Sequence, residues 1–130
     1  MVLDTDVASR AFKGQLPEVL AARLAGRQPL LTFVTIGELT QWTRIRRWGP
    51  RRITSLDAWL ADKPVIPAAR PIAETWGQIA AAATLRGRAR PVNDTWIAAC
   101  CLAYGLPLAT VNTKDFADFA DHDGLALLVR

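Results

Sequence analysis

Histidine and cysteine, which supply many metal sites and catalytic groups, are scarce in this 130-residue chain, which has one histidine and two cysteines. The cysteines, Cys100 and Cys101, are adjacent, so they are poor disulfide partners, and two such ligands do not make a zinc site. Both fall in an apolar helical pattern, and we expect reduced core residues. The single histidine, His122, stands in an acidic stretch without a second histidine, and we expect it at the surface.

Long apolar runs are also missing. No stretch approaches the roughly 20 apolar residues that span a bilayer, and the start, Met1-Val2-Leu3-Asp4, lacks the regions of a signal peptide. We therefore expect a cytoplasmic protein without a membrane segment. A composition of 51% hydrophobic and 22% charged residues is sufficient for a packed core. The length fits a single domain over residues 1–130.

Short apolar runs typical of strands alternate with longer segments of helical periodicity. The runs predict strands at about residues 1–4, 30–34, 64–66, 107–111 and 125–129. Helices are predicted over 35–47 and 54–61, over the apolar face from Ile72 to Ala83, and over the face from Ile97 to Tyr104, which Gly105 ends. This alternation predicts an α/β domain with a mainly parallel sheet.

Four acidic residues stand at comparable places in this pattern. Asp4 follows the first strand, Glu38 opens the helix after the second, Asp94 opens a helix, and Asp115 follows the fourth strand. Parallel strands end at the same edge of a sheet, so residues just past those ends converge on one crevice. Asp94 does not directly follow a predicted strand. We expect the four carboxylates to meet, although they are far apart in sequence.

Carboxylates brought together repel one another, and a divalent cation is the usual compensation. Mg²⁺ takes hard oxygen ligands, keeps several waters, and is typically held by one or two carboxylates plus substrate phosphate. Such an ion orients an attacking water and stabilises charge on a phosphate, which predicts phosphodiester hydrolysis. Each acid also has a structural interpretation, because Thr35 with Glu38 fits a capping box, and Asp4, Asn93 and Asp94 fit helix N-caps. Capping and metal binding are compatible.

Basic residues give the chain a net charge of +4, and most are clustered arginines, which suit phosphate. On a helix that begins near Thr35, Arg46 lies on the same face as Glu38. We therefore expect Arg46, together with Arg86 and Arg88, to bind RNA; the alternatives are a solvated basic surface or a protein interface. The five tryptophans are expected in the core or an interface.

Four segments together resemble the PIN-domain ribonucleases, specifically the VapC-like toxins of bacterial toxin–antitoxin operons. The segments are Leu3–Val7, Thr35–Leu39, Arg90–Ala99 and Leu108–Phe116, in the family's order and spacing. The resemblance implies a three-layer α/β sandwich with a central, mainly parallel sheet and helices on both faces. It also implies RNA cleavage that depends on Mg²⁺, which Mn²⁺ can replace, a homodimer, and a neutralising VapB-like antitoxin.

The resemblance also assigns roles to single residues. Asp4 and Asp94 are similar to the family's main metal ligands, Glu38 to its third acid and Asp115 to its fourth. Thr5, Thr110 and Asn112 are expected as polar neighbours that line the site. Two positions depart from the family pattern: Asp6 replaces a usual asparagine, and Val111 replaces a frequent arginine. The first adds negative charge beside the crevice and the second removes a possible phosphate contact.

Two other functions are compatible with parts of the sequence. Asp4 and Asp6 after an apolar strand fit the D-x-D nucleophile of haloacid-dehalogenase-like phosphatases, but the downstream residues are too compressed for that layout, and Glu38 and Asp94 would have no role. A non-catalytic PIN module could keep the fold and use its arginines only to hold RNA or a protein. The presence of all four acids favours an enzyme.

Overall fold

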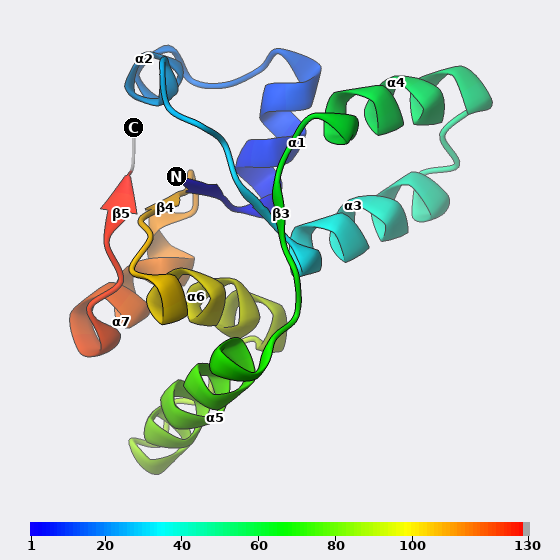
Figure 1. Ribbon diagram of the computed structural model, residues 1–130. Helices are drawn as coiled ribbons and strands as arrows, with labels where there is room; N and C mark the ends of the chain where they lie inside the picture. Colours follow the sequence, from blue (N-terminus) through cyan, green and yellow to red (C-terminus); the bar gives the residue numbers. More distant parts are fainter. Residues whose placement is uncertain (129–130) are drawn as a thin grey trace.

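Five short parallel strands form the centre of the computed structural model, which describes residues 1–128 (Figure 1). Three of them, β1 (Val2–Leu3), β4 (Leu108–Ala109) and β5 (Leu127–Leu128), pair in the order β1-β4-β5. The other two, β2 (Leu31–Thr32) and β3 (Val65–Ile66), pair with each other. A parallel bridge between Val2 and Leu30 joins the two groups. The strands therefore run in the order β3-β2-β1-β4-β5, which confirms the predicted parallel α/β architecture.

Helices cover both faces of these strands (Figure 1). They are α1 (Thr5–Lys13), α2 (Glu18–Leu24), α3 (Phe33–Ile45), α4 (Pro50–Ala61), α5 (Arg70–Leu85), α6 (Val92–Tyr104) and α7 (Thr113–Asp123). Neighbouring strand residues point to opposite faces. Val2 and Leu108 accordingly pack in a core with α5, α6 and α7, whereas Leu3 and Ala109 pack in a second core with α1, α2, α3 and α4. This arrangement confirms the three-layer sandwich.

The helix ends correct several sequence interpretations. The predicted helices 35–47 and 54–61 exist, but α3 begins at Phe33 and α4 at Pro50. Thr32, whose hydroxyl accepts a hydrogen bond from the Thr35 amide at 3.2 Å, caps α3, so the Thr35–Glu38 capping box is wrong. Asn93 and Asp94 are not N-caps either, because α6 is preceded by Pro91 and Asp94 lies in its first turn.

Other local predictions are confirmed. Asp4 caps α1, since its Oδ1 accepts a hydrogen bond from the Val7 amide at 2.8 Å. Gly105 ends α6 with a φ of +64°, a left-handed conformation that favours glycine. Cys100 and Cys101 are free and buried in the core, and the His122 side chain is 44% exposed. Within residues 1–128, no helix is long and apolar enough to cross a membrane. The predicted strand 125–129 extends to residue 129, which lies outside the described residues.

Candidate active site

The ends of β1 and β4 place two polar residues side by side under the site. The Asp4 amide donates a hydrogen bond to the Ala109 carbonyl at 3.1 Å, which fixes Asp4 at the carboxyl end of β1 and beside the next residue of the neighbouring strand, Thr110. Asp4 is 3% exposed and Thr110 is fully buried. Because both are fixed by backbone pairing, the position of the Asp4 carboxylate is set by the sheet itself.

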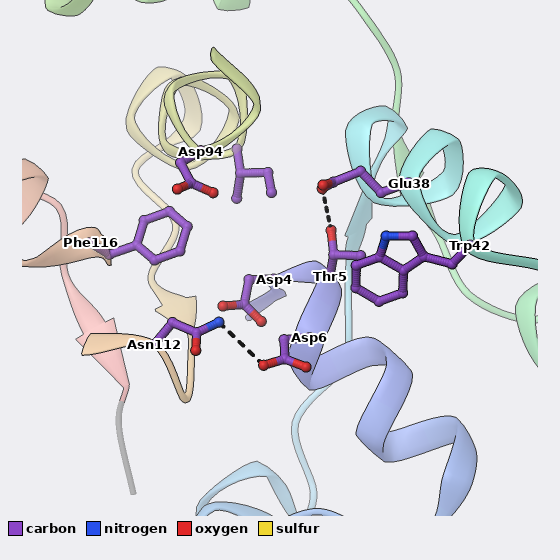
Figure 2. Close-up of a pocket in the computed structure, with 9 residues that line it drawn as sticks. Asp4, Thr5, Asp6, Glu38, Trp42, Asp94, Asn112 and Phe116 are labelled. Carbon is purple, nitrogen blue, oxygen red and sulfur yellow. Dashed lines mark hydrogen bonds between the residues drawn. The ribbon is translucent and has the colours of Figure 1, made fainter. Parts of the chain in front are cut away.

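Three of the four predicted acids line one crevice of about 310 Å³ at this edge (Figure 2). Asp4 comes from the end of β1, Glu38 from the second turn of α3, and Asp94 from the first turn of α6. The full lining is Asp4, Thr5, Asp6, Glu38, Trp42, Asp94, Ile97, Asn112 and Phe116. The crevice therefore combines acidic side chains with apolar ones, Trp42 on one side and Phe116 on the other (Figure 2), and it contains the predicted neighbours Thr5 and Asn112.

A chain of threonine hydroxyls holds Glu38. The Thr5 hydroxyl donates to Glu38 Oε1 at 2.7 Å, and it lies 2.9 Å from the hydroxyl of buried Thr35. Since the Thr5 proton is used on Glu38, the Thr35 hydroxyl donates to Thr5. Thr5 thus links the start of α1 to α3 and fixes the direction of the Glu38 carboxylate.

Asp6, the acid that departs from the family pattern, is held by polar partners on its own side of the crevice, and its charge adds to the rise in the pKa of Asp4. Asn112 Nδ2 donates to Asp6 Oδ2 at 3.3 Å (Figure 2), and Arg10 lies 3.7 Å from Asp6 Oδ1. The Asn112 backbone amide in turn donates to the hydroxyl of Thr110 at 2.9 Å. Asn112 therefore connects the Asp6 side of the crevice to the end of β4.

The electrostatics of the crevice favour a bound cation. Desolvation by burial raises the pKa of Asp4 to about 6, while Thr110 and the Val7 amide partly oppose the rise. Desolvation also raises the pKa of Asp94 to about 6, and the charges of Asp115 and Glu38 add to the shift. Asp4 Oδ2 is buried without a hydrogen-bond partner in the part of the chain described. A divalent ion supplies what both groups lack, namely a positive charge next to buried carboxylate oxygens.

The donors fit Mg²⁺ or Mn²⁺ held partly by water. Within residues 1–128, no group of three acidic, histidine or cysteine side chains is already arranged to ligate one ion. A full protein cage is not needed, because Mg²⁺ commonly uses one or two carboxylates and completes its shell with water and phosphate. Asp4 and Asp94 are the two carboxylates whose surroundings most oppose a bare negative charge.

Asp115 and the predicted RNA-binding arginines lie outside this lining. Asp115, in the first turn of α7, is close enough to Asp94 to raise its pKa, but it borders a neighbouring hollow that it shares with Lys114 and Arg88. Arg46 lies at the other end, over the ring of Trp42 at 5.0 Å. Arg86 lies 3.8 Å from Asp118. The structure therefore brings Asp115 and Arg46 next to residues of the crevice lining, and Arg88 to the neighbouring hollow.

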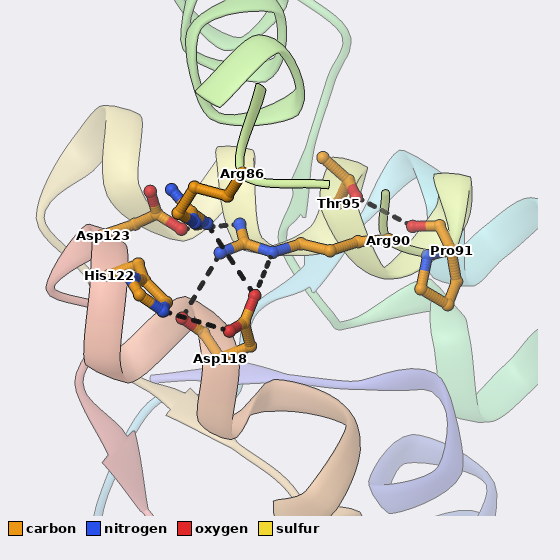
Figure 3. Close-up of polar contacts among 7 residues, drawn as sticks. All are labelled: Arg86, Arg90, Pro91, Thr95, Asp118, His122 and Asp123. Atoms are coloured by element: carbon orange, nitrogen blue, oxygen red, sulfur yellow. Dashed lines mark hydrogen bonds and ion pairs between the residues drawn. The ribbon is translucent and has the colours of Figure 1, made fainter. Parts of the chain in front are cut away.

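A buried arginine that the sequence analysis did not single out fixes the segment before Asp94. Arg90 Nε donates to Asp118 Oδ2 and Nη1 to Asp123 Oδ2, both at 2.6 Å (Figure 3). The guanidinium also lies 4.1 Å from the Phe119 ring centre. Its side chain is only 6% exposed. This contact attaches the start of α6, which carries Asp94, to α7, which carries Asp115. Sequence gives no signal for it, because the partners are 28 and 33 residues away.

Comparison with known proteins identifies the family. Residues 1–122 match the PIN domain. The chain is 32% identical over 127 residues to "Ribonuclease VapC5" of Mycobacterium tuberculosis, which covers 96% of this chain and 89% of that protein. The chain therefore belongs to the PIN-domain family, which confirms the resemblance found in its sequence and removes the phosphatase alternative.

Solved structures share the fold across nearly the whole chain. VapBC2 from Rickettsia felis, bound to a DNA fragment from its promoter, superposes with a TM-score of 0.83 at 20% identity and covers 99% of this chain and 97% of that chain. VapBC-5 from Mycobacterium tuberculosis, described as a member of the VapBC family of toxin–antitoxin systems, gives a TM-score of 0.72 at 25% identity, covering 98% and 94%. The first likeness is one of fold alone.

Proposed function

We propose that this protein is a divalent-metal-dependent endoribonuclease and the toxin of a toxin–antitoxin pair. The observation that carries the proposal is the meeting of Asp4, Glu38 and Asp94 in one crevice of a PIN domain. The relative named Ribonuclease VapC5 supports the choice of RNA as substrate. The site is acidic, so an RNA phosphate enters it only when a cation offsets the repulsion.

Each residue has a distinct task in this proposal. Asp4 and Asp94 would hold Mg²⁺, or Mn²⁺ in its place. Glu38 and Asp115 would be the third and fourth acids of the site, since the charges of both raise the pKa of Asp94. When bound, the ion lowers the pKa of a water molecule and stabilises charge on the scissile phosphate. Thr5 keeps the Glu38 carboxylate directed into the crevice, and Thr110 and Asn112 hold the floor of the site at the end of β4. The apolar side chains of the lining limit the access of bulk water to the site. They are Trp42, Ile97 and Phe116.

The proposed partners follow from the named relatives. The structural neighbours are VapBC complexes, and we therefore assign this chain a VapB-like antitoxin. In line with the family resemblance, we also propose a homodimeric assembly and a cytoplasmic location. A free ribonuclease damages its own cell, so an antitoxin must close the crevice or place a basic side chain among its carboxylates.

Cleavage of RNA by the purified protein tests the enzymatic part. We expect cleavage with Mg²⁺ or Mn²⁺, none in EDTA, and none by Asp94→Asn protein that retains its fold. Asp121→Asn is a matched control, since Asp121 is exposed and lies on α7 outside the crevice. An Asp94→Asn protein that cuts at the wild-type rate contradicts the metal-site assignment, and RNA that stays whole under all conditions favours the non-catalytic PIN module.

Expression of the chain without its antitoxin tests the toxin part. We expect growth arrest that Asp4→Ala relieves, with both proteins present at equal soluble levels. Normal growth of cells that contain soluble, RNA-cleaving wild-type protein contradicts the toxin assignment while leaving the ribonuclease assignment intact.

A further inference from the structure

One face of α3 and its C-cap residue carry a carboxylate, an indole and a guanidinium in a row. Glu38, Trp42 and Arg46 are spaced four residues apart, so Glu38 and Trp42 lie on one side of the helix and Arg46, at the C-cap, continues that side. With a rise of about 1.5 Å per residue, Trp42 lies about 6 Å and Arg46 about 12 Å along the axis from Glu38. The row therefore begins in the acidic crevice and leads out of it.

Trp42 is shared between the core and the crevice. Its ring packs against the buried cluster around Leu3, Val7 and Leu39, and the side chain is only partly buried. It also lines the crevice, where it lies beside Thr5 and faces the carboxylates from the α3 side (Figure 2). Because the core holds the ring, its orientation is fixed before any ligand binds, and ligand stacking on it needs little further ordering. Arg46 lies over the ring but is not part of the crevice lining, so a base would meet the ring from the crevice side.

Arg46 completes the row with an available charge. The centre of its guanidinium lies 5.0 Å from the Trp42 ring centre, a distance typical of a cation–π contact. The residue is exposed, and within residues 1–128 no carboxylate lies within 4.0 Å of its guanidinium. Stacking on the indole limits the directions that the fork can take, while its outer N–H groups stay in solvent. A guanidinium in this state suits a phosphate oxygen.

We propose that Trp42 and Arg46 form a nucleotide subsite for single-stranded RNA, in which an unpaired base next to the scissile bond stacks on Trp42 and the following phosphate pairs with Arg46. The inference rests on the proposed ribonuclease function and specifies its substrate. A base in a duplex has both faces covered by its neighbours, so only an unpaired base can stack on a protein ring. The subsite therefore accepts a base only from a loop or a single strand. The tryptophans were expected in the core or an interface, so this role of Trp42 adds to that expectation.

The chain contains a chemically matched control. Arg52 lies 3.8 Å from the Trp48 ring centre and forms the same kind of pair. Trp48 stacks on Phe12 with a centroid distance of 6.0 Å, and among the residues described it is not part of the crevice lining. If any exposed arginine on a tryptophan strengthens RNA binding, both pairs contribute to the affinity equally. If the effect comes from a subsite, only Trp42 and Arg46 contribute.

Binding of a labelled single-stranded oligoribonucleotide to Asp94→Asn protein tests the subsite. We expect Trp42→Leu to weaken binding about 5- to 100-fold, the range for loss of one base stack, and Trp42→Phe to retain most of the affinity. An oligonucleotide with one abasic position loses affinity by a similar factor, and combining it with Trp42→Leu adds little further loss. The abasic ligand gives the same information without altering the protein, so it guards against a misfolded variant.

The salt dependence of the same binding tests Arg46. Arg46→Ala should flatten the slope of log affinity against log salt by about 0.7, the value for one phosphate contact with a single strand, and Arg52→Ala should leave the slope unchanged. The subsite is refuted if the abasic and Trp42→Leu effects stay below twofold, or if Arg46→Ala and Arg52→Ala give the same slope.

Cleavage by the wild-type protein separates this inference from the function on which it rests. Metal-dependent cleavage together with unchanged binding by folded Trp42→Leu protein refutes the subsite alone. Absence of metal-dependent cleavage refutes the ribonuclease and the subsite together.

Discussion

We expect the substitution Arg90→Ala to lower the folding stability of this protein strongly. The variant removes two ion pairs at 2.6 Å and the contact of the guanidinium with Phe119. It leaves the Asp123 carboxylate, which is 9% exposed, without its cation. The main loss therefore comes from an uncompensated buried charge.

The magnitude follows from that burial. Removing one partner of a buried ion pair costs about 3–5 kcal/mol, and because Asp118 is more exposed than Asp123 we expect about 3 kcal/mol. For a chain of this length each kcal/mol corresponds to roughly 3–5 °C in melting temperature. The expected fall is therefore about 10 °C, together with a lower urea midpoint at unchanged m-value.

Arg70→Ala is the matched control. Arg70 also forms an ion pair at 2.6 Å, with Glu74, but the two side chains are 90% and 58% exposed. An exposed pair of this kind contributes at most about 0.5 kcal/mol. If Arg90→Ala shifts the urea midpoint no more than Arg70→Ala does, the proposed attachment of α6 to α7 is wrong.

The free energy of unfolding of the wild-type and Arg90→Ala proteins, measured as a function of pH, tests whether the loss of stability is ionic. Hydrogen bonding to Arg90, the largest cause, holds the pKa of Asp118 below its ordinary 3.8. A carboxylate whose pKa is lower in the folded state adds stability above its unfolded pKa and loses it as the pH falls through the folded pKa. The difference in free energy of unfolding between the wild-type and Arg90→Ala proteins should therefore decrease below pH 3.8. A difference that stays constant to pH 2.5 assigns the effect to packing on Phe119 instead.

Three further changes have defined outcomes. Thr5→Val removes the donor to Glu38 and should lower kcat/KM about tenfold, the loss of one hydrogen bond to a charged group. It also removes the acceptor of the buried Thr35 hydroxyl, so we expect the melting temperature to fall by a few degrees. Gly105→Ala forces alanine to a φ of +64° and should lower the free energy of unfolding in urea by about 1 kcal/mol. Gly77→Ala should instead raise it, because Gly77 lies inside α5 with open space around the added methyl. Metal-free protein should gain stability from pH 7.5 to pH 5, because the raised pKa of Asp94 favours its protonated form when folded, and Asp94→Asn should reduce that gain.

The sequence predicted the parallel sheet and two of the crevice acids, Asp4 and Glu38, from the pattern of strands and the residues that follow them. Polar residues after parallel strands meet at one edge, and this rule located Asp4 directly and Glu38 through the helix that follows β2. Asp94 reaches the crevice from the first turn of α6, which no strand precedes, and its position was supplied by the family resemblance. The predicted role of Asp94 as a helix cap is wrong, because Pro91 occupies the N-cap position of α6 three residues earlier.

The remaining parts depend on tertiary contacts. The Thr35–Glu38 spacing fits a capping box, but Glu38 instead accepts its hydrogen bond from Thr5, 33 residues away. Arg90 stood in an arginine-rich segment that suggested RNA binding, and only the folded chain shows it buried between Asp118 and Asp123. One local pattern does predict a further residue of the crevice. Trp42 follows Glu38 by four residues on α3, and this spacing places the indole on the same face of the helix.

The central claim is that the crevice carboxylates bind a divalent cation, and calorimetric titration of Mn²⁺ into metal-free protein at pH 7.5 tests it directly. We expect the wild-type protein and the Asp121→Asn control to bind Mn²⁺ with the same affinity. Asp94→Asn should bind at least tenfold more weakly, because it removes one of the two proposed ligands. Equal Mn²⁺ affinity in folded Asp94→Asn and wild-type protein would contradict the account.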